Sequence, residues 1–210
     1  MNLFHFIVLN RDQVLELTWE HVSLVAISIL LAVVVGIPLG ITIARWPKWN
    51  KPVLGFANII QTIPSLALFG FLLPVPWLGA RVDRLAILAL TLYALLPIIR
   101  NTYTGIRGVE PSVVEAGRGM GMTDTQLLLQ VELPLALSVI LAGVRVAAVM
   151  SVGLATLAAA IGAGGLGEFI FRGLAMVNNQ LILAGAIPAA LLALSADLVL
   201  GWLERRLRPR

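Results

Sequence analysis

The sequence predicts an all-α integral membrane protein with about five transmembrane helices. Of its 210 residues, 59% are hydrophobic and only 12% are charged, which is about half the charged fraction of an ordinary soluble domain. The apolar residues also form long runs, and neither 21–44 nor 52–80 contains Asp, Glu, Lys or Arg. A helix needs about 20 such residues to cross the hydrocarbon core of a bilayer. Composition and run length together therefore exclude a soluble fold.

We expect five spans in one transmembrane domain that occupies residues 1–210. The third span is the shortest, because Arg84 and Arg100 lie close together, and its flanking arginines must extend to the interface. Residues 136–172 leave two arrangements open, either one span with a partly re-entrant segment or two short spans, which would make six. The expected spans are about 22–44, 53–73, 82–99, 136–160 and 180–203.

The basic residues between the spans predict the orientation, because connections rich in Lys and Arg remain in the cytoplasm. The connections on one side carry Arg45, Lys48, Lys51, Arg100, Arg107, Arg118, Arg205, Arg206, Arg208 and Arg210. Those on the other side carry only Arg11, Arg81, Arg84 and Arg172. We therefore expect the N-terminus outside and the C-terminus inside, which requires an odd number of spans and favours five over six.

Glycine and proline within the spans predict close packing and helix breaks. Gly36 and Gly40 form a G-x-x-x-G pattern, which allows a neighbouring helix to approach closely. Pro64 leaves a backbone carbonyl unpaired in the second span, which is tolerated only against protein or a water-filled cavity. The break is either an ordinary kink or part of a transport pathway. On the second interpretation, Gln61, Thr62 and Pro64 line the pathway.

Two ionisable residues, Arg145 and Asp197, fall within the spans, where an unpaired charge is costly. Both lie toward the cytoplasmic end of their spans. We therefore expect them to lie at similar depth and to form an ion pair between the fourth and fifth spans. Such a pair is more typical of a structural role than of a substrate site.

The segment 100–135 is the longest polar interval, and the predicted orientation places it in the cytoplasm. Ser112 with Glu115, and Thr123 with Gln126, fit two capping boxes. Glycines between the two boxes would end the first helix. The local sequence therefore predicts two short helices with a break. Helices this short are not stable in water by themselves, so they must pack against the membrane surface or against a soluble partner.

This segment resembles a known family. Glu115-Ala116-Gly117, Gly121 and Val131-x-Leu133-Pro134 are similar to the pattern E-A-A-x-x-x-G-x(9)-I-x-L-P of binding-protein-dependent ABC importer permeases. Gly replaces the third small residue and Val replaces Ile. The resemblance implies a type I ABC importer permease-like fold, in which this segment forms a coupling helix that docks on an ATP-binding subunit. The implied ATPase-coupling residues are Glu115, Ala116, Gly117, Gly121, Leu133 and Pro134.

The resemblance also implies the partners and the location. These are an ABC ATPase dimer, a second permease subunit that is identical or paralogous, a periplasmic or lipid-anchored substrate-binding protein, membrane lipid, and the bacterial inner membrane. The sequence has no G-x-x-x-x-G-K-[ST] motif, so ATP and Mg would be used by the partner ATPase. There is no cysteine, and His5 and His21 are isolated. We therefore expect no enzyme activity, metal, cofactor or nucleic-acid partner for this chain.

Three further stretches resemble the osmoprotectant branch of this family, which imports glycine betaine, carnitine or choline. They are 61–70, 95–102 and 161–167. A permease for methionine or another amino acid is the nearest alternative, because such importers share the coupling segment. A stand-alone secondary carrier or channel is the alternative from a different class. Such a carrier usually has several polar groups at mid-membrane or internal repeats with broken helices, and neither is clear here.

Overall fold

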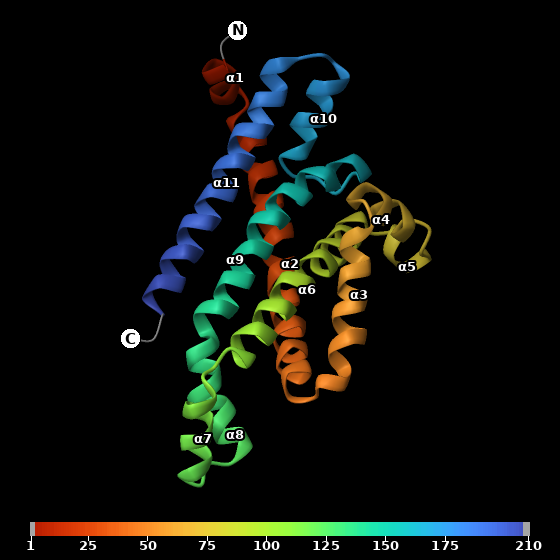
Figure 1. Ribbon diagram of the computed structural model, residues 1–210. Helices are drawn as coiled ribbons and strands as arrows, with labels where there is room; N and C mark the ends of the chain where they lie inside the picture. The colour runs from red at the N-terminus through yellow and green to blue at the C-terminus, as the bar shows by residue number, and fades with distance from the viewer. Residues whose placement is uncertain (1–2, 208–210) are drawn as a thin grey trace.

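The computed structural model describes residues 3–207, which are helical or connect helices, with no strand among them (Figure 1). The all-α fold expected from the sequence is therefore confirmed. In chain order the elements are α1 (Leu3–Leu9), α2 (Arg11–Arg45), the 3₁₀ turn η1 (Pro47–Trp49), α3 (Asn50–Thr62), α4 (Ser65–Leu72), α5 (Pro76–Gly79), α6 (Val82–Arg107), α7 (Pro111–Gly119), α8 (Asp124–Leu127), the π turn η2 (Leu128–Glu132), α9 (Leu133–Ala158), the 3₁₀ turn η3 (Ala159–Ile161), α10 (Gly167–Ala175) and α11 (Asn179–Arg206).

Among residues 3–207, four continuous helical stretches are long and apolar enough to cross a membrane. They are Arg11–Arg45, Val82–Arg107, Asp124–Ile161 and Asn179–Arg206. A fifth candidate is the pair Pro47–Thr62 and Ser65–Leu72, whose axes meet at 100°. The second expected span is thus sharply bent, because Pro64 interrupts its backbone bonding. Four or five candidate spans agree with the predicted fold class.

The helix α6 forms the centre of the molecule. It packs against α2 on one side and α9 on the other, and α11 packs against the outer side of α9. Two-thirds (67%) of the most apolar stretch of α6 is buried within the chain, against 17% for α11. The core around α6 contains Leu85, Ala86, Ala89 and Leu90, all fully buried. Most of α11 is therefore available to lipid or to another subunit.

The predicted close approach at the G-x-x-x-G pattern is confirmed, and the neighbouring helix is α6. A Cβ added to Gly40 would lie 2.5 Å from Cβ of Thr102, and one added to Gly36 would lie 2.9 Å from Cγ2 of Ile98. Neither position has room for a larger residue unless the helices separate. The two glycines therefore set the distance between α2 and α6.

The structure extends one of the expected spans and resolves the arrangement that the sequence left open. The helix α6 continues to Arg107, well beyond the expected end of the third span, and this length resolves the apparent shortness of that span. Residues 136–172 form one long helix followed by α10, which has only nine residues. A nine-residue helix rises about 14 Å, too little to cross a bilayer. The six-span arrangement is therefore not what the structure shows.

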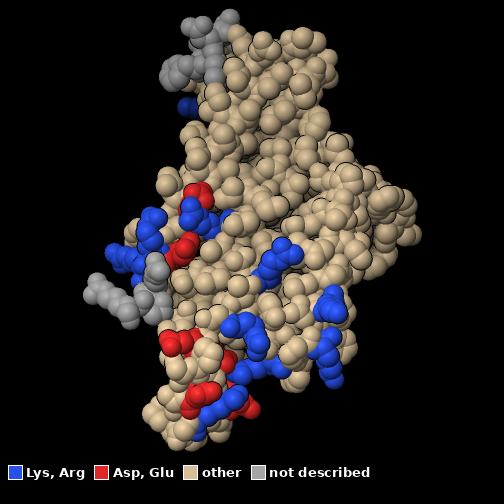
Figure 2. Space-filling view, viewed as in Figure 1, with Lys and Arg blue, Asp and Glu red and all other residues tan. Residues whose placement is uncertain are grey.

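Charged side chains are distributed unequally along the molecule. On the face shown in Figure 2 they gather over the lower half, where Figure 1 places α7, α8 and the turn between α2 and α3. The upper part of that face is almost uncharged. Two of the arginines used to predict the orientation, at 208 and 210, lie outside the described residues.

Candidate coupling site and polar contacts within the spans

The helix α7 begins differently from the prediction. Pro111 occupies its first turn and Glu110 is the N-cap, without a side-chain cap bond. The Ser112 hydroxyl donates to Oε1 of Glu110 at 2.8 Å, so the predicted capping box of Ser112 and Glu115 is wrong. Proline suits the first helical position because its missing N–H would be unsatisfied there anyway. Its placement moves Ser112 into the helix and leaves the Glu115 side chain free of any capping role.

The helix α7 ends in a Schellman motif built on Gly121. The Met122 N–H donates to the Gly117 carbonyl at 3.1 Å, and the Gly121 N–H donates to the Arg118 carbonyl at 2.9 Å. Gly121 has φ of +82°, a conformation that glycine adopts at little cost and other residues resist. The predicted break between the two helices therefore depends on the backbone of Gly121.

The second predicted capping box is confirmed. The Gln126 N–H donates to Oγ1 of Thr123 at 3.3 Å, and the Thr123 N–H donates to Oε1 of Gln126 at 2.8 Å. The helix that follows is not separate, because α8 runs through the π turn directly into α9. Pro134 lies just after the π turn, and the helix continues past it into α9 without a break.

The predicted coupling residues divide into an inner and an outer group. Gly117 is buried, and a Cβ added to it would lie 2.8 Å from Cδ1 of Leu127, which is fully buried below it. Glu115 and Ala116 are exposed, and Met120 beside them is 77% exposed. Gly117 therefore holds α7 against α8, while the outer residues present an open surface.

Leu133 and Pro134, the other two predicted coupling residues, lie at the start of α9. Leu133 is half-buried and Pro134 is exposed. Leu133 packs at the edge of a cluster around Ile106 and Ala136. This cluster connects the start of α9 to the end of α6.

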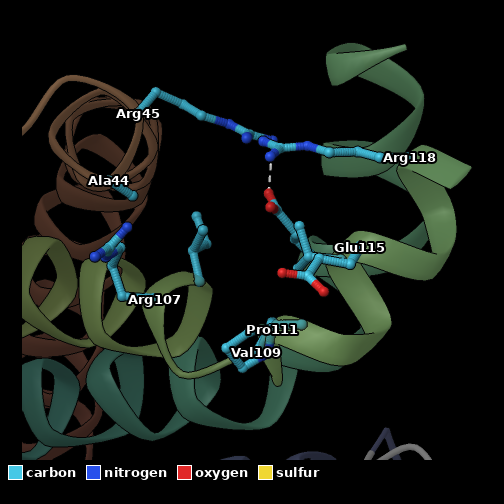
Figure 3. Close-up of a pocket in the computed structure, with 10 residues that line it drawn as sticks. Ala44, Arg45, Arg107, Val109, Pro111, Glu115 and Arg118 are labelled. Atoms are coloured by element: carbon cyan, nitrogen blue, oxygen red, sulfur yellow. Dashed lines mark hydrogen bonds and ion pairs between the residues drawn. The ribbon is translucent and has the colours of Figure 1, made fainter. Parts of the chain in front are cut away.

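A cavity of about 310 Å³ separates α7 from the ends of α2 and α6. Its lining includes Arg45, Arg107, Arg118, Glu115 and Glu132. Figure 3 shows the Glu115 carboxylate on the cavity side of α7, with arginines from α2, α6 and α7 around the opening. On the far wall, Nη2 of Arg45 lies 2.6 Å from Oε2 of Glu132. The candidate coupling region is thus charged, hollow and open at one end of the bundle.

The structure brings Arg145 and Asp197 together between α9 and α11. Nε and Nη2 of Arg145 donate to the two carboxylate oxygens of Asp197 at 2.6 and 2.8 Å. Glu204 is a third member, with Oε2 3.4 Å from Nη1 of Arg145. A Cβ added to Gly201 would lie 3.0 Å from Cζ of Arg145, so Gly201 leaves the space that the guanidinium occupies.

The break in the bent span is held to α6 by two reciprocal hydrogen bonds. Pro97 has no N–H, so the Tyr93 carbonyl, four residues earlier, lacks its usual helical donor. Nε2 of Gln61 donates to this carbonyl at 3.1 Å. In return the Tyr93 hydroxyl donates to the Ile63 carbonyl, where α3 ends. Each side chain thus satisfies a carbonyl that a helix break or a proline left unpaired.

The three residues predicted to line a pathway do not all face the same way. The Gln61 side chain is directed toward α6 by the bond just described. Thr62 and Pro64 are exposed on the surface of this chain, and Oγ1 of Thr62 donates to the Ile59 carbonyl at 2.7 Å. Thr62 and Pro64 are therefore the two that face away from the packed core.

The family is established by comparison with known proteins. The profile of the binding-protein-dependent transport system inner membrane component family matches residues 36–209. The chain belongs to this family. It is accordingly a multi-pass inner-membrane protein, and the predicted resemblance to these permeases is confirmed.

The curated relatives of this permease are similar over nearly its whole length. The glycine betaine/carnitine/choline transport system permease protein OpuCD of Bacillus subtilis is 51% identical, over 95% of this chain and 86% of the relative. The carnitine transport permease protein OpuCB of Listeria monocytogenes is 47% identical, over 96% and 91%. The choline transport system permease protein OpuBB of Bacillus subtilis is 44% identical, over 99% and 94%.

Solved structures share the fold of this permease. One chain of the MetNI methionine ABC transporter, in an inward-facing conformation, superposes with a TM-score of 0.81 at 24% identity. The match covers 91% of this chain and 94% of that one. The likeness confirms the fold expected for an ABC importer permease.

Sequence reasoning missed the ion pair of Arg45 with Glu132. The two residues are 87 positions apart, and no local pattern relates them. One signal was present, since Glu132 stands alone among apolar residues just before the fourth expected span of the permease. A carboxylate in that setting needs a partner, but the sequence does not say which arginine supplies it.

Proposed function

We propose that this chain is the transmembrane permease subunit of an ATP-driven importer of osmoprotectants such as glycine betaine, carnitine or choline, and that it forms half of the translocation pathway. The observation that carries the proposal is the similarity to relatives named for these substrates, which extends over at least 95% of the chain. We assign selection of the cargo to a separate substrate-binding protein at the outer face.

The partner for α7 in this proposal is an ATP-binding subunit. The outer face of α7 carries Glu115, Ala116 and Met120 exposed at one end of the bundle. An exposed helix of nine residues gains little stability by itself, and a docked subunit would cover it. Two permease subunits, identical or paralogous, and an ATPase dimer that uses ATP and Mg would complete the importer.

The same arrangement requires α7 to lie in the cytoplasm, with the N-terminus outside and the C-terminus inside. The gathering of charge around α7 and the turn between α2 and α3 supports this orientation. The chain contains no cysteine, so a single Ser112→Cys or Asn178→Cys variant can be labelled selectively. We expect a membrane-impermeant maleimide to label only the cysteine at 178 from the outside; the reverse pattern would contradict the orientation.

Uptake measurements test the substrate and the coupling role together. The chain would be expressed with its ATP-binding subunit and binding protein in cells without osmoprotectant uptake, and labelled glycine betaine, carnitine, choline and methionine would be compared. We expect uptake of the three quaternary ammonium compounds to depend on the ATP-binding subunit. Uptake of methionine alone would favour the amino-acid alternative, and uptake without any ATP-binding subunit would favour a stand-alone carrier.

Variants of α7 sharpen this test. Glu115→Lys reverses the charge on the exposed face, and Gly121→Val places a branched residue at φ of +82°. We expect both variants to insert in the membrane but to lose transport. Gly119→Ala is the matched control, because an added Cβ there has nothing within 4 Å. Normal uptake in both variants would refute the coupling role.

A further inference from the structure

Glu132 is the only one of the eleven acidic side chains, all within the described residues, that is buried. Its side chain is 7% exposed, and Oε2 accepts a hydrogen bond from Nη2 of Arg45 at 2.6 Å. A buried carboxylate is costly unless it is paired and hydrogen-bonded. Neither Arg45 nor Glu132 belongs to the residues that the coupling pattern singles out.

Arg45 contacts two parts of the chain at once. It is the last residue of α2, and Nη2 also lies 3.3 Å from the backbone carbonyl of Asp124, in the first turn of α8. Glu132 closes the π turn that connects α8 to α9. One guanidinium therefore connects the end of α2 to the beginning and the end of the segment that leads from α7 into α9.

This segment joins α7 to the membrane-spanning helix α9. Gly117 of α7 rests on Leu127, which is fully buried and directly precedes the π turn. π turns replace the regular helical bonding and recur at functional sites. Arg45 and Glu132 line the same cavity as Glu115 and Arg118 of α7 (Figure 3). Any movement of α7 toward or away from the bundle therefore acts on the surroundings of this ion pair.

We propose that the Arg45–Glu132 ion pair transmits the movement of α7 to α2, so that α2 and α9 respond together. The inference rests on the proposed function, in which an ATP-binding subunit moves α7. Because α2 packs closely on α6 at Gly36 and Gly40, moving α2 also moves α6. Arg45 and Glu132 are positioning residues in this proposal. Without the pair, α2 would follow α7 only through its packing against α6 and α9, and ATP hydrolysis would be linked less tightly to the rearrangement of the spans.

The alternative is that Arg45 only neutralises a buried charge. Replacing both residues separates the two roles, because buried ion pairs can often be exchanged for apolar residues of similar volume without loss of stability. The variant Arg45→Met with Glu132→Met removes the charges and the bond to Asp124 while filling the space. The exchanged variant Arg45→Glu with Glu132→Arg keeps an ion pair at the same place.

The experiment uses the complete importer in liposomes, with ATP hydrolysis measured with and without substrate-loaded binding protein, and with uptake measured in parallel. We expect the double methionine variant to assemble and to keep its basal hydrolysis. Stimulation by the binding protein and uptake per ATP should each fall about fivefold or more, the lower range of allosteric coupling. The exchanged variant should recover most of both. Arg11→Gln, which removes an exposed pair with Asp12, is the control and should behave as the wild type.

Normal stimulation and uptake in the double methionine variant would overturn the proposal. An exchanged variant that assembles but stays uncoupled would also overturn it. If the methionine variant fails to assemble, the exchanged variant decides, and failure of both to assemble would assign the pair to folding alone. Absence of the ATP-binding subunit from the wild-type complex would instead contradict the proposed function. The composition of the assembled complex shows this before any transport is measured.

Discussion

Within residues 3–207, arginine–carboxylate pairs join different helices at two places, and these pairs differ in how completely the chain encloses them. At the end of the bundle that carries α7, the side chains of Arg45 and Glu132 are 24% and 7% exposed. Between α9 and α11, those of Arg145 and Asp197 are 33% and 39% exposed, although both lie within candidate spans. One pair is complete in the single chain, and the other is open on one side.

The difference indicates where the chain depends on a partner. Charged groups within spans face the interior of a bundle or a water-filled cavity, because lipid cannot solvate them. A face that exposes Arg145, Asp197 and Glu204 therefore cannot lie against hydrocarbon. We expect a second permease subunit or the aqueous pathway to cover it in the assembled importer. The Arg45–Glu132 pair needs no second subunit to cover it, so we assign it a role in contacts between helices of this one chain.

The largest effect is expected from reversing charges at the open pair. Arg145→Asp or Asp197→Arg alone places like charges side by side at membrane depth, and uptake should fall to background. The double reversal restores an ion pair and should restore most of the uptake. Transport and the amount of inserted subunit would be measured for all three variants. A double variant as inactive as the single ones would show that these residues do more than pair with each other.

The enclosed pair should dominate the stability of the single chain. Arg45→Met leaves the buried Glu132 carboxylate without its partner, which we expect to cost about 3–5 kcal/mol of the free energy of unfolding. Arg145→Met should cost less in detergent, because water reaches Asp197 and Glu204. Unfolding of the purified chain would be compared for both variants. Equal losses would mean that the exposure of an ion pair in the single chain does not determine its contribution to the free energy of unfolding.

The parts of this molecule that the sequence predicted are those that depend on nearby residues. The long apolar runs predicted the all-α membrane fold because crossing a bilayer demands them. The capping box of Thr123 with Gln126 was predictable because its bonds span only three residues. Gly36 and Gly40 predicted a close approach, because glycines at that spacing lie on one face of a helix and allow a neighbouring helix to pack closely. The same local rule failed at Ser112, because Pro111 competes for the start of the helix.

The remaining features depend on how distant elements pack. Gln61 could be read as a pathway residue because the sequence does not reveal that the carbonyl freed by Pro97 lies beside it. The junction of α8 with α9 required the π turn, which has no clear sequence signal. The partner of Glu132 is 87 residues away, so only the arrangement of α2 beside α9 identifies it. Long-range polar pairing was thus predictable for Arg145 and Asp197, which are isolated charges within apolar spans, but not for Gln61 or Glu132.

The smallest effect is expected where polar groups meet inside the bent span, a place that is enclosed but uncharged. Tyr93→Phe removes the hydroxyl that donates to the Ile63 carbonyl and should lower the free energy of unfolding by about 0.5–1.5 kcal/mol. Tyr103→Phe is the matched control, because the Tyr103 hydroxyl makes no hydrogen bond within residues 3–207. Both would be measured by unfolding of the purified chain. If the two variants are equally stable, the Tyr93 hydroxyl adds nothing measurable, and the bend is held by Pro64, by packing and by the bond from Gln61 to the Tyr93 carbonyl.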